Sequence, residues 1–160
     1  MKSVLLSIQP KWCELIASGK KMIEVRKSAP KEVPFKVYMY ETKAGFIEAV
    51  RGTCPKCAFS RGKIISEFVC DKVDQIIEAT AGICFADKDF NILDGENEHK
   101  KTCLSVDELA NYLGEDKNGL CKNGYAWHIS DLKIYDKPRE LSEFGIARAP
   151  MSWCYVDELQ

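Results

Sequence analysis

The fold is decided near the N-terminus, by the stretch SGKKMIEVRK that runs from Ser18 to Lys27. Its second half alternates apolar and charged residues, a pattern typical of a β-strand whose two faces differ. Ile23 and Val25 should point to one face. Glu24 and Arg26 should point to the other, where a carboxylate beside a guanidinium adds little stability if both are solvated. The pair is therefore either a surface ion pair or part of a binding site.

The residues before this strand predict a compact strand–helix–strand unit at the start of the chain. The apolar run from Lys2 to Gln9 suits a buried strand. Pro10 takes a favourable first position of a helix, which should continue to Ser18 and end at Gly19 in a left-handed conformation. The charged strand follows at once.

Strands dominate the rest of the predicted fold. Runs of β-forming residues predict strands at 35–42, at 63–73 with an extension towards Ile77, at 124–135 and at 151–156. One strand–helix–strand unit followed by successive strands favours an α+β fold with a mixed, curved sheet of five or six strands or a small barrel.

Short helices and two long loops complete the prediction. The capping box from Ser105 to Glu108 predicts a helix at 106–113, and a short helical turn is expected at 138–144. Residues 43–62 and 79–102 are predicted to be long loops or insertions, because they are polar or interrupted by glycine and proline.

The composition is that of a globular protein, with 46% apolar and 29% charged residues among 160. This length suits one domain, which we expect to span 1–160. No apolar run is long enough to cross a bilayer, and no signal peptide is evident. We therefore expect a cytoplasmic protein without a membrane partner, as a monomer or a weak homodimer.

The charges are distributed unevenly along the chain. Residues 1–72 hold 14 Lys and Arg against 7 Asp and Glu, whereas residues 73–160 hold 9 against 17. This asymmetry would mark a basic face for RNA or DNA if the two halves stayed apart in space. If one compact domain intermixes them, it has no such meaning, and the sequence leaves both alternatives open.

Lys21 precedes the charged strand, where its long side chain can reach the same place as Glu24 and Arg26. In a binding site, Glu24 would accept hydrogen bonds from the amino group of a base. The two cations would bind phosphate or carbonyl oxygens. These three residues are the primary candidates for ligand binding.

Two segments resemble a known family. The pattern S-I-x-P-x-W from Ser7 and the motif G-x-K-x-x-E-x-R-K from Gly19, together with the run WHISDL from Trp127, resemble the small bacterial and phage branch of the ASCH domain family, which is related to the PUA fold. The resemblance implies a PUA-like β-barrel flanked by short helices. It also implies a cleft that is lined by the G-x-K-x-x-E-x-R motif and binds RNA or a modified nucleotide.

Some small members of this family are amidohydrolases that remove an acetyl group from modified cytidine. Their motif is similar to K-x-x-T-x-R, with a threonine nucleophile and an assisting lysine. This chain matches the lysine with Lys21 but has Glu24 at the threonine position. If the chain is an enzyme, Lys21 and Glu24 would activate water to hydrolyse an N-acylated nucleoside such as acetylated cytidine, because a carboxylate can act as a general base.

Four further residues are candidates for the same cleft. His128 and Ser130 alternate with Ile129 along one predicted strand and so share a face, although an isolated strand histidine is more often structural. Trp153 could stack on a base, and the alternative is a core tryptophan in the final strand. Lys11 is included as a ligand-binding candidate as well.

A zinc site is an alternative use of the two predicted loops. Cys54 and Cys57 form a C-x-x-C pair, and His99 with Cys103 offers a second half. Against zinc, the chain has a single C-x-x-C pair, so free thiols are the default expectation for its eight cysteines. No other cofactor is expected, because the sequence lacks a P-loop and a dinucleotide-binding glycine motif.

Overall fold

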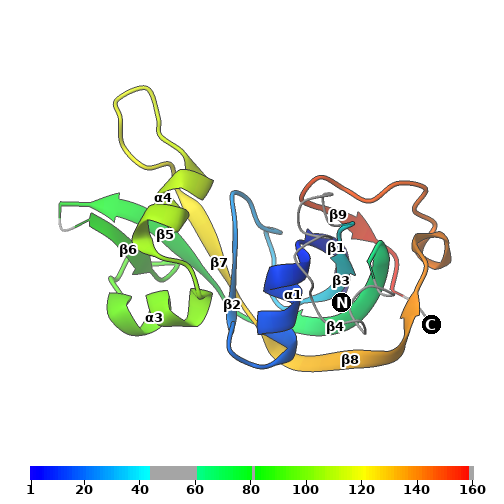
Figure 1. Cartoon of the computed structure of the whole chain (residues 1–160). Helices are drawn as coiled ribbons and strands as arrows, with labels where there is room; N and C mark the ends of the chain where they lie inside the picture. The colour runs from blue at the N-terminus through cyan, green and yellow to red at the C-terminus, as the bar shows by residue number, and fades with distance from the viewer. Residues whose placement is uncertain (44–60, 81, 159–160) are drawn as a thin grey trace. The chain divides into compact units, whose positions relative to one another are not determined.

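The computed structural model of the protein describes residues 1–43, 61–80 and 82–158. Their contacts divide the chain into two compact units, each built on its own sheet (Figure 1). Unit 1 comprises Met1–Ser18, Pro34–Val69 and Ser130–Gln160. Unit 2 comprises Gly19–Val33 and Cys70–Ile129.

Unit 1 contains a mixed five-stranded sheet in the order β8-β4-β3-β1-β9. The strands are β1 (Lys2–Ile8), β3 (Phe35–Glu41), β4 (Lys63–Cys70), β8 (Ser130–Arg139) and β9 (Trp153–Val156). β1 and β3 are parallel, whereas β9 is antiparallel to β1, and β8 is antiparallel to β4. A parallel pair needs a crossover connection, and the helix α1 (Pro10–Ala17) forms part of it, with Cys13 and Ile16 buried.

The apolar strand predicted at the N-terminus lies inside this sheet, between β3 and β9. All its residues from Ser3 to Ile8 are buried, as expected for a strand that is covered on both faces. Leu5 packs with Tyr38 and Phe144, and these two rings meet edge to face at a centroid distance of 4.7 Å. Phe144 ends the short 3-10 helix η2 (Leu141–Phe144), which confirms the second half of the helical turn predicted at 138–144. Pro138 and Arg139 belong instead to β8.

Unit 2 contains an antiparallel four-stranded sheet in the order β2-β7-β5-β6. Its strands are β2 (Ile23–Arg26), β5 (Val73–Ala79), β6 (Gly82–Ala86) and β7 (Gly124–His128), and its helices are α3 (Gly95–Thr102) and α4 (Val106–Leu113). α4 begins with the predicted capping box of Ser105 and Glu108. It packs on the sheet in a core formed by Ile23, Val25, Ile76, Phe85, Leu109, Leu113 and Ala126.

The register of β2 separates two kinds of side chain. Ile23 and Val25 belong to the core of unit 2. Glu24 and Arg26 alternate with them along the strand, and Glu24 lies opposite the fully buried Trp127 of β7. The alternation predicted from the sequence is confirmed, but all four residues of β2 are buried.

Two predicted strands are each divided in two. The predicted strand from 63 towards 77 consists of β4 and β5, and the one at 124–135 consists of β7 and the first part of β8. Within each run the chain passes from one sheet to the other, so its hydrogen-bond partners change, and local β propensity does not report such a change. His128 and Ser130 therefore lie on different strands in different sheets, and the prediction that they share one strand face is wrong.

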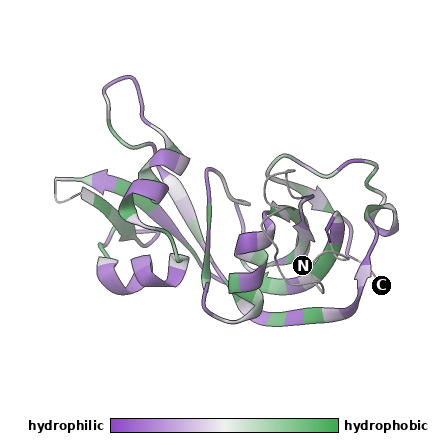
Figure 2. Ribbon diagram, viewed as in Figure 1, coloured by the Kyte–Doolittle hydropathy of each residue, from purple (hydrophilic) through white to green (hydrophobic). Residues whose placement is uncertain are grey.

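The predicted loop at 79–102 is also wrong, because it contains β6 and α3. α3 is almost entirely hydrophilic (Figure 2), so no apolar stripe reveals it. Its signal in the sequence lies at its ends, with Asp94 as the N-cap, Glu96 and Glu98 in the first turn, and cations in the last turn. The other predicted loop, at 43–62, falls mostly outside the described residues.

The α+β class is confirmed, but the predicted barrel is wrong. The described residues form two separate sheets of five and four strands instead of one curved sheet, and neither sheet closes on itself. A closed barrel would need the two edge strands of one sheet to pair. None of the described helices has the length and apolar character needed to cross a membrane. The assignment of 1–160 as one domain stays a prediction.

Gly124, at the start of β7, should not tolerate a side chain. A Cβ at this position would lie 2.5 Å from Cδ2 of the buried Leu113 on α4. We expect Gly124→Ala to lower the free energy of unfolding by about 1–3 kcal/mol, the usual cost of overpacking, as measured by urea denaturation. Gly95→Ala is the matched control, because a Cβ at Gly95 meets nothing within 4 Å and alanine favours a helix. An equal loss in both variants would contradict this account of the packing.

Candidate functional site

Lys21, Glu24 and Arg26 form one buried ion-pair group in unit 2, here named the Glu24 cluster. Nη2 of Arg26 donates a hydrogen bond to Oε1 of Glu24 at 2.7 Å. Nζ of Lys21 lies 3.4 Å from Oε2 of the same carboxylate. The exposed fractions are 3% for Lys21, 5% for Glu24 and 8% for Arg26. The arrangement is therefore not a surface ion pair, and the predicted convergence of one carboxylate and two cations is present.

The C-terminal end of α3 holds Lys21 in place. Nζ of Lys21 donates to the carbonyl oxygen of Thr102 at 2.6 Å. The backbone N–H of the next residue, Met22, donates to the carbonyl of Lys101 at 2.9 Å. Carbonyls in the last turn of a helix have no partner within the helix and carry partial negative charge. The helix end thus binds both the chain and the cation that pairs with Glu24.

Tyr112 of α4 lies beside the Glu24 cluster, a position for which the sequence offers no signal. Burial raises the pKa of its hydroxyl, Arg26 opposes this shift, and Glu24 adds to it. The ring centroid lies 5.4 Å from Nζ of Lys27, within the range of a cation–π contact. Because 38% of Tyr112 is exposed, part of this aromatic residue reaches solvent next to a buried group of charges.

His128 belongs to a second charged group in the same unit. Its Nε2 lies 2.6 Å from Oδ2 of Asp74 on β5 and 3.8 Å from Oε2 of Glu98 on α3. Each acid also pairs with a lysine. Nζ of Lys72 lies 2.7 Å from Oδ2 of Asp74, and Nζ of Lys101 lies 2.7 Å from Oε1 of Glu98. The sequence identifies the histidine but not its acidic partners, because strand pairing and helix packing bring them together from distant positions.

The other three ligand-binding candidates belong to unit 1. Nζ of Lys11 lies 4.3 Å from the centre of the Trp12 ring. Oγ of Ser130 donates to the carbonyl of Val69 at 2.9 Å. Trp153 is half-buried in β9 and meets a neighbouring tyrosine ring edge to face. Their part in a ligand site stays a prediction.

The predicted zinc ligands are described only in part. Cys54 and Cys57 lie outside the described residues. The ring of His99 contacts an aromatic ring of β6, and Sγ of Cys103 lies 3.3 Å from the carbonyl oxygen of Lys20. The cysteines that the structure describes form no disulfide. Zinc at the four predicted ligands stays a prediction.

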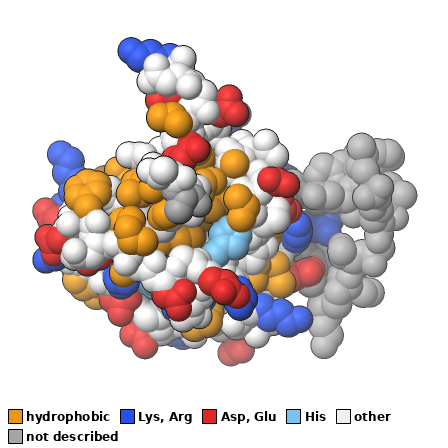
Figure 3. All heavy atoms as spheres, turned by 90° about the vertical axis from the view of Figure 1, so that its left-hand side faces the viewer, with side chains coloured by type: hydrophobic (Ala, Val, Ile, Leu, Met, Phe, Trp, Pro, Cys, Tyr) orange, Lys and Arg blue, Asp and Glu red, His pale blue; other side chains and the backbone are white. Residues whose placement is uncertain are grey.

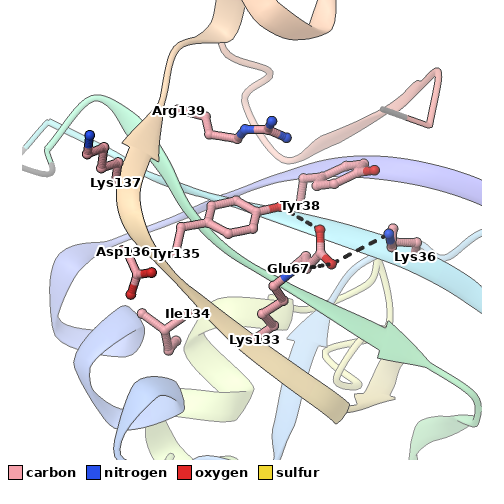
Figure 4. A pocket seen from close by; sticks show the side chains of 9 residues that line it. All are labelled: Lys36, Tyr38, Glu67, Lys133, Ile134, Tyr135, Asp136, Lys137 and Arg139. Carbon is pink, nitrogen blue, oxygen red and sulfur yellow. Dashed lines mark hydrogen bonds and ion pairs between the residues drawn. The ribbon is translucent and has the colours of Figure 1, made fainter. Parts of the chain in front are cut away.

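Unit 1 contains a polar pocket of about 460 Å³, in which Tyr135 and Lys36 both reach Glu67 (Figure 4). Oη of Tyr135 donates to Oε2 of Glu67 at 2.6 Å, and Nζ of Lys36 lies 3.6 Å from Oε1. Burial raises the pKa of Tyr135, and the hydrogen bond to Glu67 raises it further. The carboxylate is thus engaged inside a mainly basic lining, which consists of Lys36, Tyr38, Glu67, Lys133, Ile134, Tyr135, Asp136, Lys137 and Arg139.

A family model described as the ASCH domain matches residues 6–113, a range that contains the whole Glu24 cluster. The chain belongs to the ASCH domain family. The family membership that the motif predicted is therefore confirmed. Among curated proteins, none matches the sequence.

Solved ASCH structures have a similar fold. The crystal structure of ASCH from Zymomonas mobilis aligns with a TM-score of 0.64 and 16% identity, over 98% of this chain and 89% of that one. A tyrosine-to-phenylalanine variant of the Zymomonas mobilis protein aligns with a TM-score of 0.64 and 15% identity, over 99% of this chain and 92% of that one. A serine-to-alanine variant aligns with a TM-score of 0.63 and 15% identity, over 98% of this chain and 89% of that one. At this identity the similarity to these ASCH proteins shows the fold alone.

The Glu24 cluster should contribute to stability in a way that a surface pair does not. Glu24→Ala would leave Lys21 and Arg26 buried without their counter-ion. We expect it to lower the free energy of unfolding by about 3–5 kcal/mol, as measured by urea denaturation. The control is Glu96→Ala, which removes an exposed ion pair with Lys100 and should leave the unfolding midpoint close to that of the wild type. Equal midpoints for the two variants would show that the cluster is not buried in solution.

Proposed function

We propose that this ASCH chain binds RNA or a modified nucleotide through the Glu24 cluster and the surface that Tyr112 and Lys27 form beside it. The observation that carries the proposal is a carboxylate buried between two cations, with a partly exposed aromatic ring next to them. Membership of the ASCH family supports it, because the relation of that family to PUA domains implies binding of nucleic acid.

Stability alone is a weak reason for such a cluster. Taking charged groups out of water costs several kcal/mol for each ion, and apolar residues of similar volume often stabilise a fold equally well. What a buried cluster does provide is a set of donors and acceptors at fixed positions. Recognition requires that kind of preorganisation, since flexible groups would lose entropy on binding.

Each group has a role suited to a nucleotide. A carboxylate offers about four acceptor sites, and the contacts with Lys21 and Arg26 use only part of them, so Glu24 can also accept from the amino group of a base. Arg26 and Lys27 would bind phosphate or carbonyl oxygens. Tyr112 would stack on a base, a contact that contributes about 1–3 kcal/mol. A further contact is proposed for His128, which lies in the same unit. Lys11, Ser130 and Trp153 lie in unit 1 and are proposed as ligand-binding residues of that unit.

The amidohydrolase alternative receives less support from the same geometry. A general base needs an oxygen that can take a proton from water. Both oxygens of Glu24 already face a cation, Oε1 towards Arg26 and Oε2 towards Lys21. Incubation with acetylated cytidine, followed by chromatography of the products, tests this alternative. Turnover that is lost in Lys21→Met would favour hydrolysis over simple binding.

A triple variant separates binding from folding. Lys21→Met, Glu24→Leu and Arg26→Met together replace the cluster by apolar groups of similar volume, which is often neutral for stability or favourable. We expect this variant to stay folded, with a free energy of unfolding lower by about 1–3 kcal/mol, because Lys21 no longer donates to the carbonyl of Thr102. It should bind a short single-stranded RNA at least about tenfold more weakly, as measured by fluorescence anisotropy, because the charge-assisted hydrogen bonds are lost.

The matched control removes an exposed ion pair from the same unit. Glu96→Leu with Lys100→Met deletes one acid and one lysine on α3 and should bind the RNA as the wild type does. Binding by the wild type should also weaken as the NaCl concentration rises, because phosphate contacts release counter-ions. A folded triple variant that binds RNA as tightly as the wild type would show that the Glu24 cluster is not the binding site.

A further inference from the structure

We propose that Asp74, Glu98 and His128 bind a first-row divalent metal ion, of the class of Mn²⁺. These three residues are named the His128 cluster. Their ligating atoms, one from each side chain, all lie within 4.8 Å of one another. Two carboxylates and an imidazole are a ligand set that suits such ions. The proposed site lies wholly inside unit 2 and uses two acids to which the nucleotide proposal gives no role.

The fold brings the three ligands together from three elements. Asp74 on β5 lies opposite Ala126 of β7. His128 is two residues further along β7 and therefore on the same face of the sheet. Glu98 comes from α3, which packs against β2 and β6. The side chain of His128 is 19% exposed, so an ion can reach the cluster from solvent. Figure 3 shows surface histidine atoms next to apolar and acidic side chains.

The distances are close to those of a coordinated ion. A cation held at about 2.1 Å from each ligand separates neighbouring ligand atoms by roughly 3 Å. Nε2 of His128 lies 2.6 Å from Oδ2 of Asp74 and 3.8 Å from Oε2 of Glu98, values on either side of that separation. Small side-chain rotations would therefore bring all three atoms onto one ion.

One oxygen of Glu98 gives a second reason to expect a metal ion at this cluster. Its Oε2 is buried and has no hydrogen-bond partner within the described parts of the chain. The other oxygen, Oε1, is held by Lys101 at 2.7 Å, which orients Oε2 towards His128. A buried carboxylate oxygen without a donor is costly, and a metal ion would satisfy it. Glu96, on the opposite side of the same helix, is 81% exposed and pairs only with Lys100 among the contacts described for it.

Lys72 is expected to compete with the ion. Its Nζ lies 2.7 Å from Oδ2 of Asp74, the same oxygen that would coordinate the metal, and 49% of its side chain is exposed. Lys72 can therefore move into solvent when a divalent cation takes its place. Removing this lysine should favour the metal, whereas a purely structural ion-pair network would gain nothing from its loss.

The test uses the full chain, treated with EDTA and dialysed, and titrated with Mn²⁺. Binding is followed by the loss of the electron paramagnetic resonance signal of the free ion. Mn²⁺ is chosen because thiolates, which would form the predicted cysteine zinc site, are poor ligands for it. We expect one Mn²⁺ per chain. His128→Ala and Glu98→Gln should each weaken binding about tenfold or more, and Lys72→Met should strengthen it.

Glu96→Gln is the matched control on the same helix and should bind Mn²⁺ as the wild type does. Circular dichroism and the urea midpoint establish that each variant is folded. A wild type that binds no Mn²⁺ at large excess, or equal binding by Glu98→Gln and Glu96→Gln, would overturn the proposal. The titration contains no RNA, so its failure would leave the proposed nucleotide site untouched.

Discussion

The carboxylate of Glu24 can be buried only because two cations reach it, and this requirement constrains the chain around it. Arg26 meets Oε1 from two residues further along β2, on the same strand face. Lys21 meets Oε2 from the segment before the strand. Gly19, with a φ of 72°, adopts the left-handed conformation that glycine tolerates best, two residues before Lys21. The motif therefore serves as a structural element as well as a candidate recognition element.

α3 supports both charged groups of unit 2. The carbonyl of its last residue, Thr102, accepts from Nζ of Lys21, and Glu98 in its first turn meets His128. A helix with so few apolar residues cannot attach to a sheet mainly by apolar burial. Its attachment relies instead on ion pairs and on the carbonyls at its end. This explains why a hydrophilic segment is ordered against the sheet.

Much of the fold could be predicted from local patterns, and the failures share one cause. The apolar run of β1, the capping box of α4 and the alternation of β2 are signals that each element carries within itself. The division of the two long strands has no such local signal. β4 and β5 differ in the strands with which they pair and not in β propensity, and the same holds for β7 and β8. α3 has no apolar period, and its signals in the sequence are its capping residue and the order of its charges.

The candidate site residues also divide into those with a local signal in the sequence and those brought together only by the fold. Lys21, Glu24 and Arg26 are close in sequence, so their convergence could be predicted from one strand. Asp74 and Glu98 meet His128 only through strand pairing and helix packing, and Tyr112 reaches the Glu24 cluster only through the position of α4. Since α3 contacts both the Glu24 cluster and the His128 cluster, the two proposed sites share one support.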